Sequence, residues 1–412
     1  MNKYDLLIIG GGMVGLTLAL AIRKETSLTI AIVDNQPASP LTKEPELRVS
    51  AINAASQKIF ENLDVWSEVI SQRAQAYHHM HVWDKEGFGS LDFDLQALGL
   101  SKQFEQLGHI IENKAIRFAL WEKAQADDGI TFYTQEPITN VAMGDSEVFA
   151  TFTTQMPITA KLVIGADGAN SWLRQQVDMP IAFRDYDHHA IVATVKAEHG
   201  HQNTAWQVFL ESGPLAFLPL ATEQGNEHLA SIVWSTSPSE AKRLCGLSTD
   251  EFNKEITAAS DGKLGQISLE SETATFPLTM RLAHDFVKGK AVLVGDAAHT
   301  IHPLAGQGVN LGLLDASSLA QIIAEQYQRK NELWCNEAML KQYSRWRRAE
   351  ASDMVMAMEA IKQIFAPRHP VTNIIRGVGM KVLDTITPVK SLMVKQALGL
   401  KSDLPKLAKK HV

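Results

Sequence analysis

Short apolar runs that flank a helical stretch begin the chain. Leu6–Ile9 is apolar and ends in glycines, and Leu28–Val33 is again mostly apolar and is closed by Asp34. Apolar runs of this length are typical of buried parallel strands. The residues between them, 13–23, are rich in Leu, Ala and Ile and predict a helix. The first 34 residues therefore predict one βαβ unit, and a polar, proline-rich loop follows it.

The pattern of hydrophobic and polar positions changes twice further along. Helices are predicted at two segments, 47–69 and about 108–124, and short strands at two others, 76–93 and 130–164. From about Ile181 to Phe276 apolar and polar residues alternate, as in HHAIVATVKA and HLASIVWSTS, which predicts an antiparallel sheet with one wetted face. A buried strand at 291–294 returns to the first pattern, and the last 75 or so residues are mostly helical, with one long helix predicted over Leu340–Ala366.

Composition places the chain among soluble globular proteins. It has 412 residues, of which 45% are hydrophobic and 21% charged, and its net charge is −7. This composition excludes a disordered chain, and the acidic balance does not attract nucleic acid. Cys245 and Cys335 lie far apart, and no run of 18 apolar residues is present. We therefore expect a cytoplasmic protein without a disulfide framework, a secretory signal or a membrane span.

A glycine-rich turn follows the first predicted strand. It has the spacing of a dinucleotide-binding fingerprint, in Gly10, Gly12, Met13, Val14 and Gly15. Glycines there permit the tight turn and let backbone N–H groups at the helix start approach a pyrophosphate. Asp34 lies 19 residues after Gly15, at the end of the second strand, where a carboxylate can accept hydrogen bonds from a ribose. The fingerprint does not distinguish NAD from FAD.

These patterns together predict an α/β fold with an α+β second domain. A Rossmann-like cofactor domain is expected in three pieces, 1–75, 106–180 and 280–340. A mostly antiparallel β-sheet domain that binds the substrate is expected to be inserted in it, at 76–105 and 181–279. Helices are expected over 341–412.

Two further glycine-rich turns carry a family resemblance. GADGANS at 165–171 and GDAAH at 295–299, which continues to Asn310, each follow a predicted strand. With the first fingerprint they resemble the three signatures of the FAD-dependent aromatic hydroxylases, the flavoprotein monooxygenases of the para-hydroxybenzoate hydroxylase type. RVSAIN at 48–53, GPLAFLPL at 213–220 and HTIHP at 299–303 resemble the bacterial ubiquinone-biosynthesis hydroxylases. RVSAINAAS, HVWDKEGFGSLDF and DYDHHAIVATV are most similar to the branch that acts on 2-polyprenylphenol at ring carbon 5.

The resemblance implies FAD as the cofactor and a set of residues that contact it. Asp296 would hold a ribityl hydroxyl, Arg48 the pyrophosphate side, and Asp167 the FAD and nicotinamide side. Asn113 stands where the family often has a longer polar side chain. The remaining members of the set would wall the flavin ring or direct backbone N–H groups at its N1–C2=O edge, namely Pro303, Gly306, Gly308, Val309 and Asn310.

The implied reaction is hydroxylation of a polyprenylated phenol with O2, through a C4a-hydroperoxide of flavin reduced by NAD(P)H or another donor. Tyr186, His188 and His299 are candidate bases for the phenol. Three alternatives stay open: a sister ubiquinone hydroxylase acting at carbon 6 or carbon 1, an FAD-dependent isoprenoid reductase, and a non-catalytic flavoprotein subunit of a biosynthetic complex. The 14 histidines lack HExxH or Cys-pair spacing, so no metal site is expected.

The C-terminal segment differs in charge from the rest of the chain. Residues 367–412 hold nine Lys or Arg against two acids, a charge of +7, whereas the preceding residues carry −14. The apolar residues of the first predicted helix in this segment share one face, namely Ile374, Ile375, Val378, Val382 and Ile386, and Arg376 and Lys381 lie elsewhere on it. Such a helix either packs on the body of the protein or binds a membrane surface. We expect the latter at the inner face of the cytoplasmic membrane, together with contacts to other ubiquinone-biosynthesis proteins.

Overall fold

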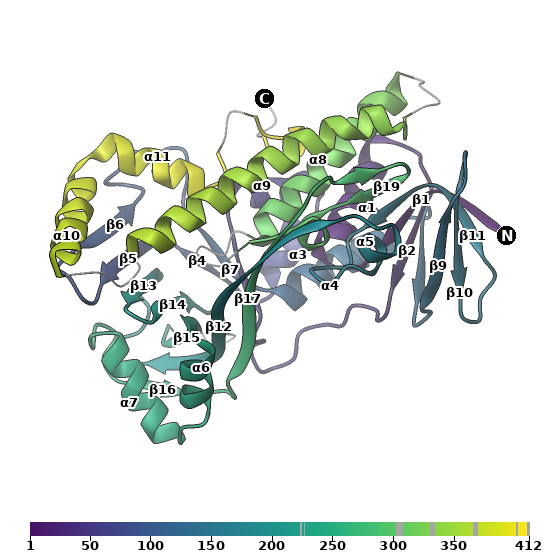
Figure 1. Ribbon diagram of the computed structural model, residues 1–412. Coiled ribbons are helices and arrows are strands. Elements are labelled where there is room, and N and C mark those ends of the chain that lie inside the picture. The colour runs from purple at the N-terminus through teal and green to yellow at the C-terminus, as the bar shows by residue number, and fades with distance from the viewer. Residues whose placement is uncertain are drawn as a thin grey trace.

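Three sheets and a set of covering helices make up the protein (Figure 1). The computed structural model describes residues 1–222, 225, 227–301, 308–329, 334–365, 370–400 and 403–409, with the backbone alone at 362, 364–365 and 370–376. No helix among these residues is long and apolar enough to cross a membrane.

The first sheet is built around the N-terminal strand. Its order is β18 (Val287–Lys288), β19 (Ala291–Leu293), β11 (Ile158–Gly165), β1 (Asn2–Ile9), β2 (Ile30–Asp34) and β8 (Ile130–Thr134). All neighbours in it are parallel except β18 and β19, and an antiparallel ribbon of β9 (Ile138–Met143) and β10 (Val148–Phe152) extends from β11. The predicted βαβ unit, with α1 (Met13–Glu25) as its helix, is confirmed.

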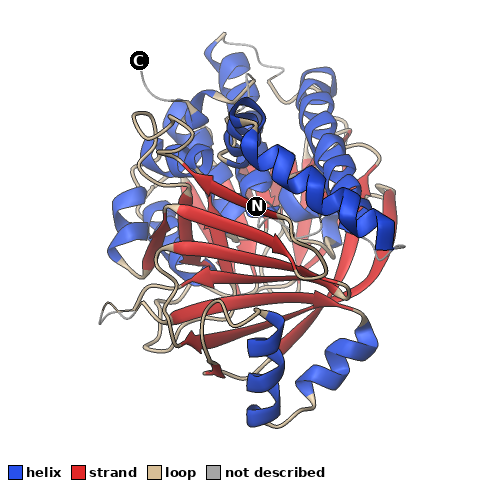
Figure 2. Cartoon of the chain, turned by 90° about the vertical axis from the view of Figure 1, so that its left-hand side faces the viewer, coloured by secondary structure: helices blue, strands red, loops and turns tan. Residues whose placement is uncertain are grey.

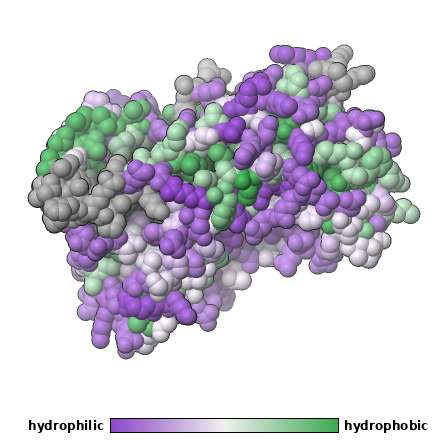
Figure 3. Space-filling model, in the orientation of Figure 1, coloured by the Kyte–Doolittle hydropathy of each residue, from purple (hydrophilic) through white to green (hydrophobic). Residues whose placement is uncertain are grey.

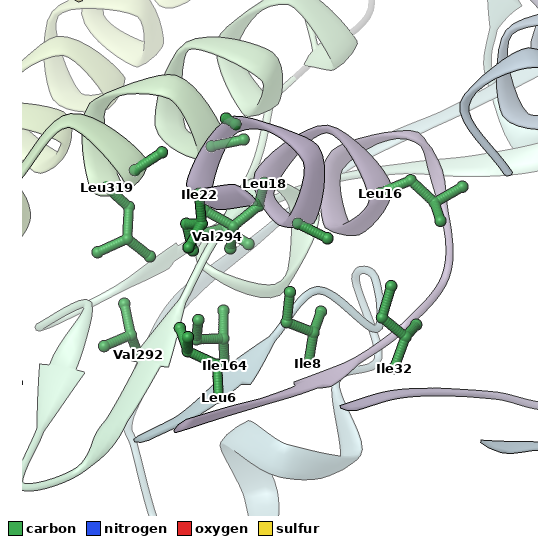
Figure 4. Close-up of a cluster of buried hydrophobic side chains, with 14 of the residues drawn as sticks. Leu6, Ile8, Leu16, Leu18, Ile22, Ile32, Ile164, Val292, Val294 and Leu319 are labelled. Carbon is green, nitrogen blue, oxygen red and sulfur yellow. The ribbon is translucent and has the colours of Figure 1, made fainter. Parts of the chain in front are cut away.

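The core of this unit lies between the sheet and two helices, α1 and α8 (Gly308–Gln328). Ile8 of β1 pairs with Ile164 of β11 on one side and with Ile32 of β2 on the other, and all three are fully buried. Figure 4 shows Leu18 and Ile22 of α1 above these strands. Strands buried on both faces explain the continuous apolar runs in the sequence.

The second sheet is mostly antiparallel, as expected. Its order is β20 (His299–Thr300), β17 (Ala274–Ala283), β12 (Ile181–Ala197), β15 (Leu229–Thr236), β14 (Gly213–Pro219), β13 (Thr204–Leu210), β5 (His79–Asp84) and β6 (Ser90–Asp94), with β16 (Ile267–Leu269) beside β12. Only β13 and β5 run parallel in this set. Two helices not expected from the sequence, α6 (Pro238–Cys245) and α7 (Thr249–Ala259), cover one face, where Phe252 packs with Ile191 and Ile232 (Figure 2).

A third, three-stranded sheet corrects two predicted helices. Residues 47–69 begin with β3 (Val49–Ile52), followed by α2 (Ala54–Asn62) and α3 (Trp66–Ser71). Residues 108–124 begin with β7 (Gly108–Glu112), which pairs with β3 and β4 (Ala74–Tyr77) and precedes α4 (Asn113–Gln125). A Cβ on Gly108 would lie 2.7 Å from the Ile52 carbonyl oxygen, so the close pairing of these strands depends on that glycine.

The C-terminal helices connect the two large sheets. The long predicted helix is α9 (Glu337–Phe365), which runs along the top of Figure 1, and its expected last residue, Ala366, lies outside the described residues. Two further helices, α10 (Pro370–Thr385) and α11 (Thr387–Ala397), pack against the edge of the second sheet, where Met380 contacts Val82 and Leu91. The domain boundaries expected from the sequence stay a prediction, and β17 runs through the one at 279/280.

Candidate active site

The glycine-rich turn between β1 and α1 leaves one position open. A Cβ on Gly10, which has a φ of 111°, would lie 2.4 Å from the Ala166 carbonyl oxygen, and one on Gly15 would lie 2.0 Å from that of Gly10. By contrast, a Cβ on Gly12 would meet no heavy atom of the described residues within 4 Å. Helix α1 starts at this open position with no side-chain cap and no acid in its first turn. Its first N–H groups therefore suit an anionic ligand such as a pyrophosphate.

Asp34 at the end of β2 is fixed against this turn. Its Oδ2 accepts a hydrogen bond from the Gly11 N–H at 2.6 Å, and its Oδ1 accepts from Arg117 Nη2 at 3.2 Å. Arg117 in α4 also donates to the Gly11 carbonyl oxygen at 2.8 Å. The motif does not identify Arg117, because the helix that carries it starts about 100 residues beyond the fingerprint. Its position beside Asp34 is set by the packing of α4 on α1.

Two arginines hold the second glycine-rich loop, and one of them also binds the third. Arg174 of α5 (Trp172–Gln176) donates to the carbonyl oxygens of Ala297 at 2.8 Å and Ala169 at 2.9 Å. Arg281 of β17 also donates to the Ala169 oxygen, at 2.6 Å. Burial lowers the pKa of the Arg174 guanidinium, as does the nearby Arg281. The sequence motifs identify neither residue. Both hold the loop at 165–171, and Arg174 also joins it to the segment 295–299.

Asp167 and Asp296 belong to these two loops. Asp167 accepts from the Leu173 N–H through Oδ2 at 3.1 Å, while its buried Oδ1 has no partner among the described residues. Asp296 is exposed, although Gly295 and Ala297 on either side of it are buried. Solvent thus reaches the carboxylate of Asp296, but the protein atoms around it partly desolvate its charged form. This desolvation raises the pKa of Asp296. Both carboxylates suit a ligand that donates hydrogen bonds from hydroxyl groups.

Positive charge lies near Asp296 on more than one side. His299 acts against the rise in the pKa of Asp296, and so do the guanidinium groups of Arg48 and, more weakly, Arg281. Arg48 is exposed just before β3, with its guanidinium 5.8 Å from the ring centre of Phe276 in β17. The structure therefore brings Arg48 and Asp296, two residues expected to bind the cofactor, into one electrostatic environment.

Two asparagines of the expected set face the protein itself. Asn113 Oδ1 accepts from Ser50 Oγ at 2.6 Å. Asn310, which is 1% exposed, donates from Nδ2 to the Ala51 carbonyl oxygen at 2.8 Å. Their side chains thus hold α4 and the first turn of α8 against β3.

The remaining expected contacts lie at or before the start of α8. A Cβ on Gly308 would meet no atom of the described residues within 4 Å, and Val309 beside it is half-buried. The first turn of α8 contains no acid, so its N–H groups can face the electron-rich edge of a flavin. Pro303 and Gly306 lie outside the described residues.

The three candidate bases do not lie together. Tyr186 is buried in β12, where burial and the charge of Glu359 raise the pKa of its phenol, and His188 Nδ1 lies 2.8 Å from the Tyr186 carbonyl oxygen. His299 lies in β20, where it pairs with Leu282 of β17, and only 1% of the residue is exposed. A base must reach the proton that it removes. His299 Nε2 is hydrogen-bonded to the buried Asp315, and the low exposure of the residue keeps its ring from a substrate, so its role as a base stays a prediction that this geometry does not favour.

The open space at Gly12, the unpartnered Asp167 oxygen and the accessible Asp296 together fit a bound FAD. Among the described residues, no three His, Cys, Asp or Glu side chains are grouped so that they could hold a metal ion. Fold and site thus define a dinucleotide-binding flavoprotein.

Comparison with known proteins identifies the class further. The chain belongs to the FAD binding domain family, which matches residues 3–358. It is 32% identical over 398 residues to the 3-demethoxyubiquinol 3-hydroxylase of Escherichia coli, covering 96% of this chain and 98% of that protein. It is 30% identical to the human ubiquinone biosynthesis monooxygenase COQ6, covering 94% and 91% of the two chains.

Solved structures show the same fold at low sequence identity. The p-nitrophenol 4-monooxygenase of Pseudomonas putida superposes with a TM-score of 0.75 at 16% identity, covering 98% of this chain and all of that one. A complex of PqsL from Pseudomonas aeruginosa with 2-aminobenzoylacetate also gives 0.75, at 19% identity, over 92% of this chain and all of that one. The expected flavoprotein monooxygenase fold, the cofactor FAD and the enzyme class are confirmed: this protein is an FAD-dependent monooxygenase.

Proposed function

We propose that this monooxygenase hydroxylates the aromatic ring of a polyprenylated phenol in ubiquinone biosynthesis, at ring carbon 5 of 2-polyprenylphenol. The convergence of three glycine-rich loops and their acids on one site carries the flavin chemistry. The substrate class is supported by near full-length similarity to two proteins named for ubiquinone biosynthesis or its intermediates. The ring carbon rests on the resemblance of RVSAINAAS and two other segments.

Bound FAD, reduced by NAD(P)H or another donor, would pass the donor's electrons to O2, from which one oxygen atom enters the ring and the other leaves as water. The residues of this chain bind and orient FAD. Gly12 and the first turn of α1 would hold the pyrophosphate, Asp34 the adenosine ribose and Asp296 a ribityl hydroxyl. The first turn of α8 would direct N–H groups at the flavin edge where negative charge develops. Tyr186 and His188 remain the candidates to receive a phenol proton.

A sister hydroxylation is the second candidate. The Escherichia coli relative is named for a demethoxyubiquinol, so a later, more substituted ring is also a fitting substrate. The proposal can be tested by mass spectrometry of quinone intermediates in cells that lack the protein and grow in air. Accumulation of 2-polyprenylphenol supports carbon 5, accumulation of a methylated or methoxylated intermediate supports a sister step, and unchanged ubiquinone refutes the substrate class.

Complementation of those cells tests the role of the site. The wild-type chain and Asp250→Ala, which changes an exposed carboxylate in α7, should restore ubiquinone, whereas Asp296→Ala should not. Consumption of one O2 for each hydroxylated product would exclude an isoprenoid reductase. Loss of product in Asp296→Ala with intact complex assembly would exclude a purely structural flavoprotein subunit.

A polyprenylated substrate resides in the bilayer, so the proposal includes peripheral binding to the inner face of the cytoplasmic membrane. Figure 3 shows apolar surface at the upper left, over α10 and α11. We call the exposed apolar residues of these two helices and of the residue between them the apolar strip, namely Val378, Val382, Ile386, Val389, Leu392 and Met393. The exposed Lys381 and Lys395 lie on the same two helices. Exposed apolar residues beside lysines suit an anionic lipid surface.

Flotation with anionic vesicles tests the membrane contact. Changing Val382 and Leu392 to Ser should reduce the floated fraction, whereas Met156→Ser, at a residue that is 78% exposed far from these helices in the sequence, should not. Equal flotation of both variants and the wild type would refute the contact. Loss of self-association rather than of flotation would assign the strip to a second copy of the chain.

A further inference from the structure

A buried charged cluster lies directly behind the loop that carries Asp296. Asp315 in α8 is fully buried, and its Oδ1 accepts a hydrogen bond from Arg347 Nε of α9 at 2.6 Å. Its Oδ2 accepts from the Gly295 N–H at 3.0 Å and lies 2.5 Å from His299 Nε2. Arg347, itself fully buried, also donates to a Glu350 carboxylate oxygen at 2.8 Å.

Stability alone does not account for such a cluster. Burying an ion pair costs solvation free energy, and a well-packed apolar pair of similar size often stabilises a fold as much or more. Burial also works against ionisation of Asp315, yet the charges of His299 and Arg347 keep the pKa of its carboxyl below the ordinary value. The carboxylate is therefore charged in the folded protein, and its oxygens are directed at specific partners on both sides.

The partners of Asp315 bracket Asp296. Gly295 immediately precedes Asp296 and has a φ of 59°, and His299 follows three residues later. All residues of the segment 295–299 are buried except Asp296. The Asp315 carboxylate thus holds both ends of the segment 295–299, in which Asp296 is the only exposed residue.

The same cluster is close to the pyrophosphate turn. A Cβ on Gly312, less than one turn before Asp315 in α8, would lie 3.2 Å from Gly295 Cα and 2.8 Å from Val14 Cγ2 of α1. Helices α1 and α8 and the loop at 295–299 therefore meet with almost no free space. A shift of Asp315 would move the start of α8 and Asp296 together.

We propose that Asp315, held by Arg347, is a positioning residue of the flavin site. Through the Gly295 N–H and the His299 ring it sets the direction of Asp296 and the approach of the first turn of α8. Asp315, the Gly295 N–H and the His299 ring need not touch the cofactor themselves. The inference rests on the proposed role of Asp296 in holding the flavin.

The test compares FAD binding with stability in Asp315→Asn. We expect the purified variant to bind FAD about ten-fold more weakly than the wild type in a fluorescence titration, because one of the two contacts of Oδ2 is lost. The midpoint potential of its bound flavin should also be more negative, since N–H groups aimed less well at the flavin stabilise its reduced form less. Arg347→Met removes the hydrogen bond to Asp315 Oδ1 and should also weaken FAD binding, whereas the control Arg345→Met, at an exposed arginine of α9, should leave both quantities unchanged.

A second control separates positioning from stability. Phe252→Ala removes a buried ring between α7 and the second sheet, and it should lower the melting temperature while leaving FAD affinity within about two-fold of the wild type. The proposal would be overturned if Phe252→Ala, along with its lower melting temperature, lost as much FAD affinity as Asp315→Asn. A folded Asp315→Asn with unchanged affinity and potential would also overturn it.

His299 decides the question if Asp315→Asn does not fold. His299→Leu removes the ring nitrogen and should weaken FAD binding about ten-fold, whereas His299→Gln, whose amide N–H can still donate to Asp315, should restore most of the affinity. Unchanged affinity in His299→Leu overturns the proposal. A wild-type chain that binds no FAD would instead refute the flavin site itself.

Discussion

Two glycines of one motif are expected to fail in different ways when each is changed to alanine. A Cβ on Gly15 would lie 2.0 Å from the Gly10 carbonyl oxygen and 3.2 Å from Ala166 Cβ. The first of these is a backbone atom at the end of a central strand, so it must shift by roughly 1 Å or more to restore an ordinary contact. Overpacking costs about 1–3 kcal/mol, and because the neighbour is backbone we expect the upper end, about 3 kcal/mol, for Gly15→Ala.

Gly12→Ala should instead affect binding. Its Cβ meets no atom of the described part of the chain within 4 Å, and its φ of −82° suits alanine, so the free energy of unfolding should fall by about 1 kcal/mol or less. The new methyl group would occupy the space expected for the pyrophosphate. Losing one charge-assisted hydrogen bond from the helix start costs about 2 kcal/mol, or roughly 30-fold in the dissociation constant of FAD.

Urea unfolding of the FAD-free protein and a fluorescence titration with FAD measure the two effects separately. The expected result is a large loss of stability in Gly15→Ala and a large loss of affinity, at nearly wild-type stability, in Gly12→Ala. Wild-type affinity in Gly12→Ala would show that the pyrophosphate does not lie against this turn. Wild-type stability in Gly15→Ala would show that the close contact at Gly10 is relieved at little cost.

Two further predictions concern stability. Burial, assisted by the charge of His78, lowers the pKa of His109 to about 4, so between pH 6.5 and 4 the unfolded chain binds a proton that the folded chain does not. Stability should therefore fall as the pH drops through this range, by about 3 kcal/mol more in the wild type than in His109→Gln, as measured by urea unfolding at pH 7 and pH 4; equal losses would contradict this. Arg73 and Glu112 form a buried pair at 2.8 Å, so Glu112→Gln should cost about 3 kcal/mol, whereas Arg243→Met, in an exposed pair, should leave stability close to that of the wild type. Similar costs for the two variants in the same assay would refute this reasoning.

The parts of the fold that the sequence predicts well are those with long or repeated local signals. The βαβ unit has an apolar strand, a glycine turn and a helix in immediate succession, and α9 has 29 residues of helical periodicity. The four-residue strand β3 lacks such a signal and is followed at once by α2, so the pattern predicts its residues as part of a helix. Its partner β7 has only five residues and also leads directly into a helix.

Helices α6 and α7 are missed by the sequence pattern although signals for them exist. Ser237 caps α6 and precedes a proline at its first position, and Ser248 with Glu251 forms a capping box at the start of α7. These signals lie within a long region of alternating strands, where the period-two pattern dominates the prediction. Start signals of helices therefore carry information that a count of apolar positions does not.

The arginines of the site cannot be predicted in the same way as its glycines and acids. Glycines and acids act within a few residues of the turn that they form, so their spacing is visible in the sequence. Arg117, Arg174 and Arg281 each act on a loop that another part of the chain contributes. Which arginine reaches which carbonyl oxygen depends on how helices and strands pack, and no local spacing encodes this.

These arginines have a consequence for how the site binds its cofactor. Arg117 holds the first glycine-rich turn, while Arg174 and Arg281 hold the second loop, and Arg174 also holds the third. Because protein contacts alone keep the loops in place, little conformational entropy needs to be lost when FAD binds. The acids and helix starts can then contribute most of their hydrogen-bonding free energy to affinity. Substitution of a loop-holding arginine should accordingly weaken FAD binding even though its side chain is directed at backbone carbonyl oxygens.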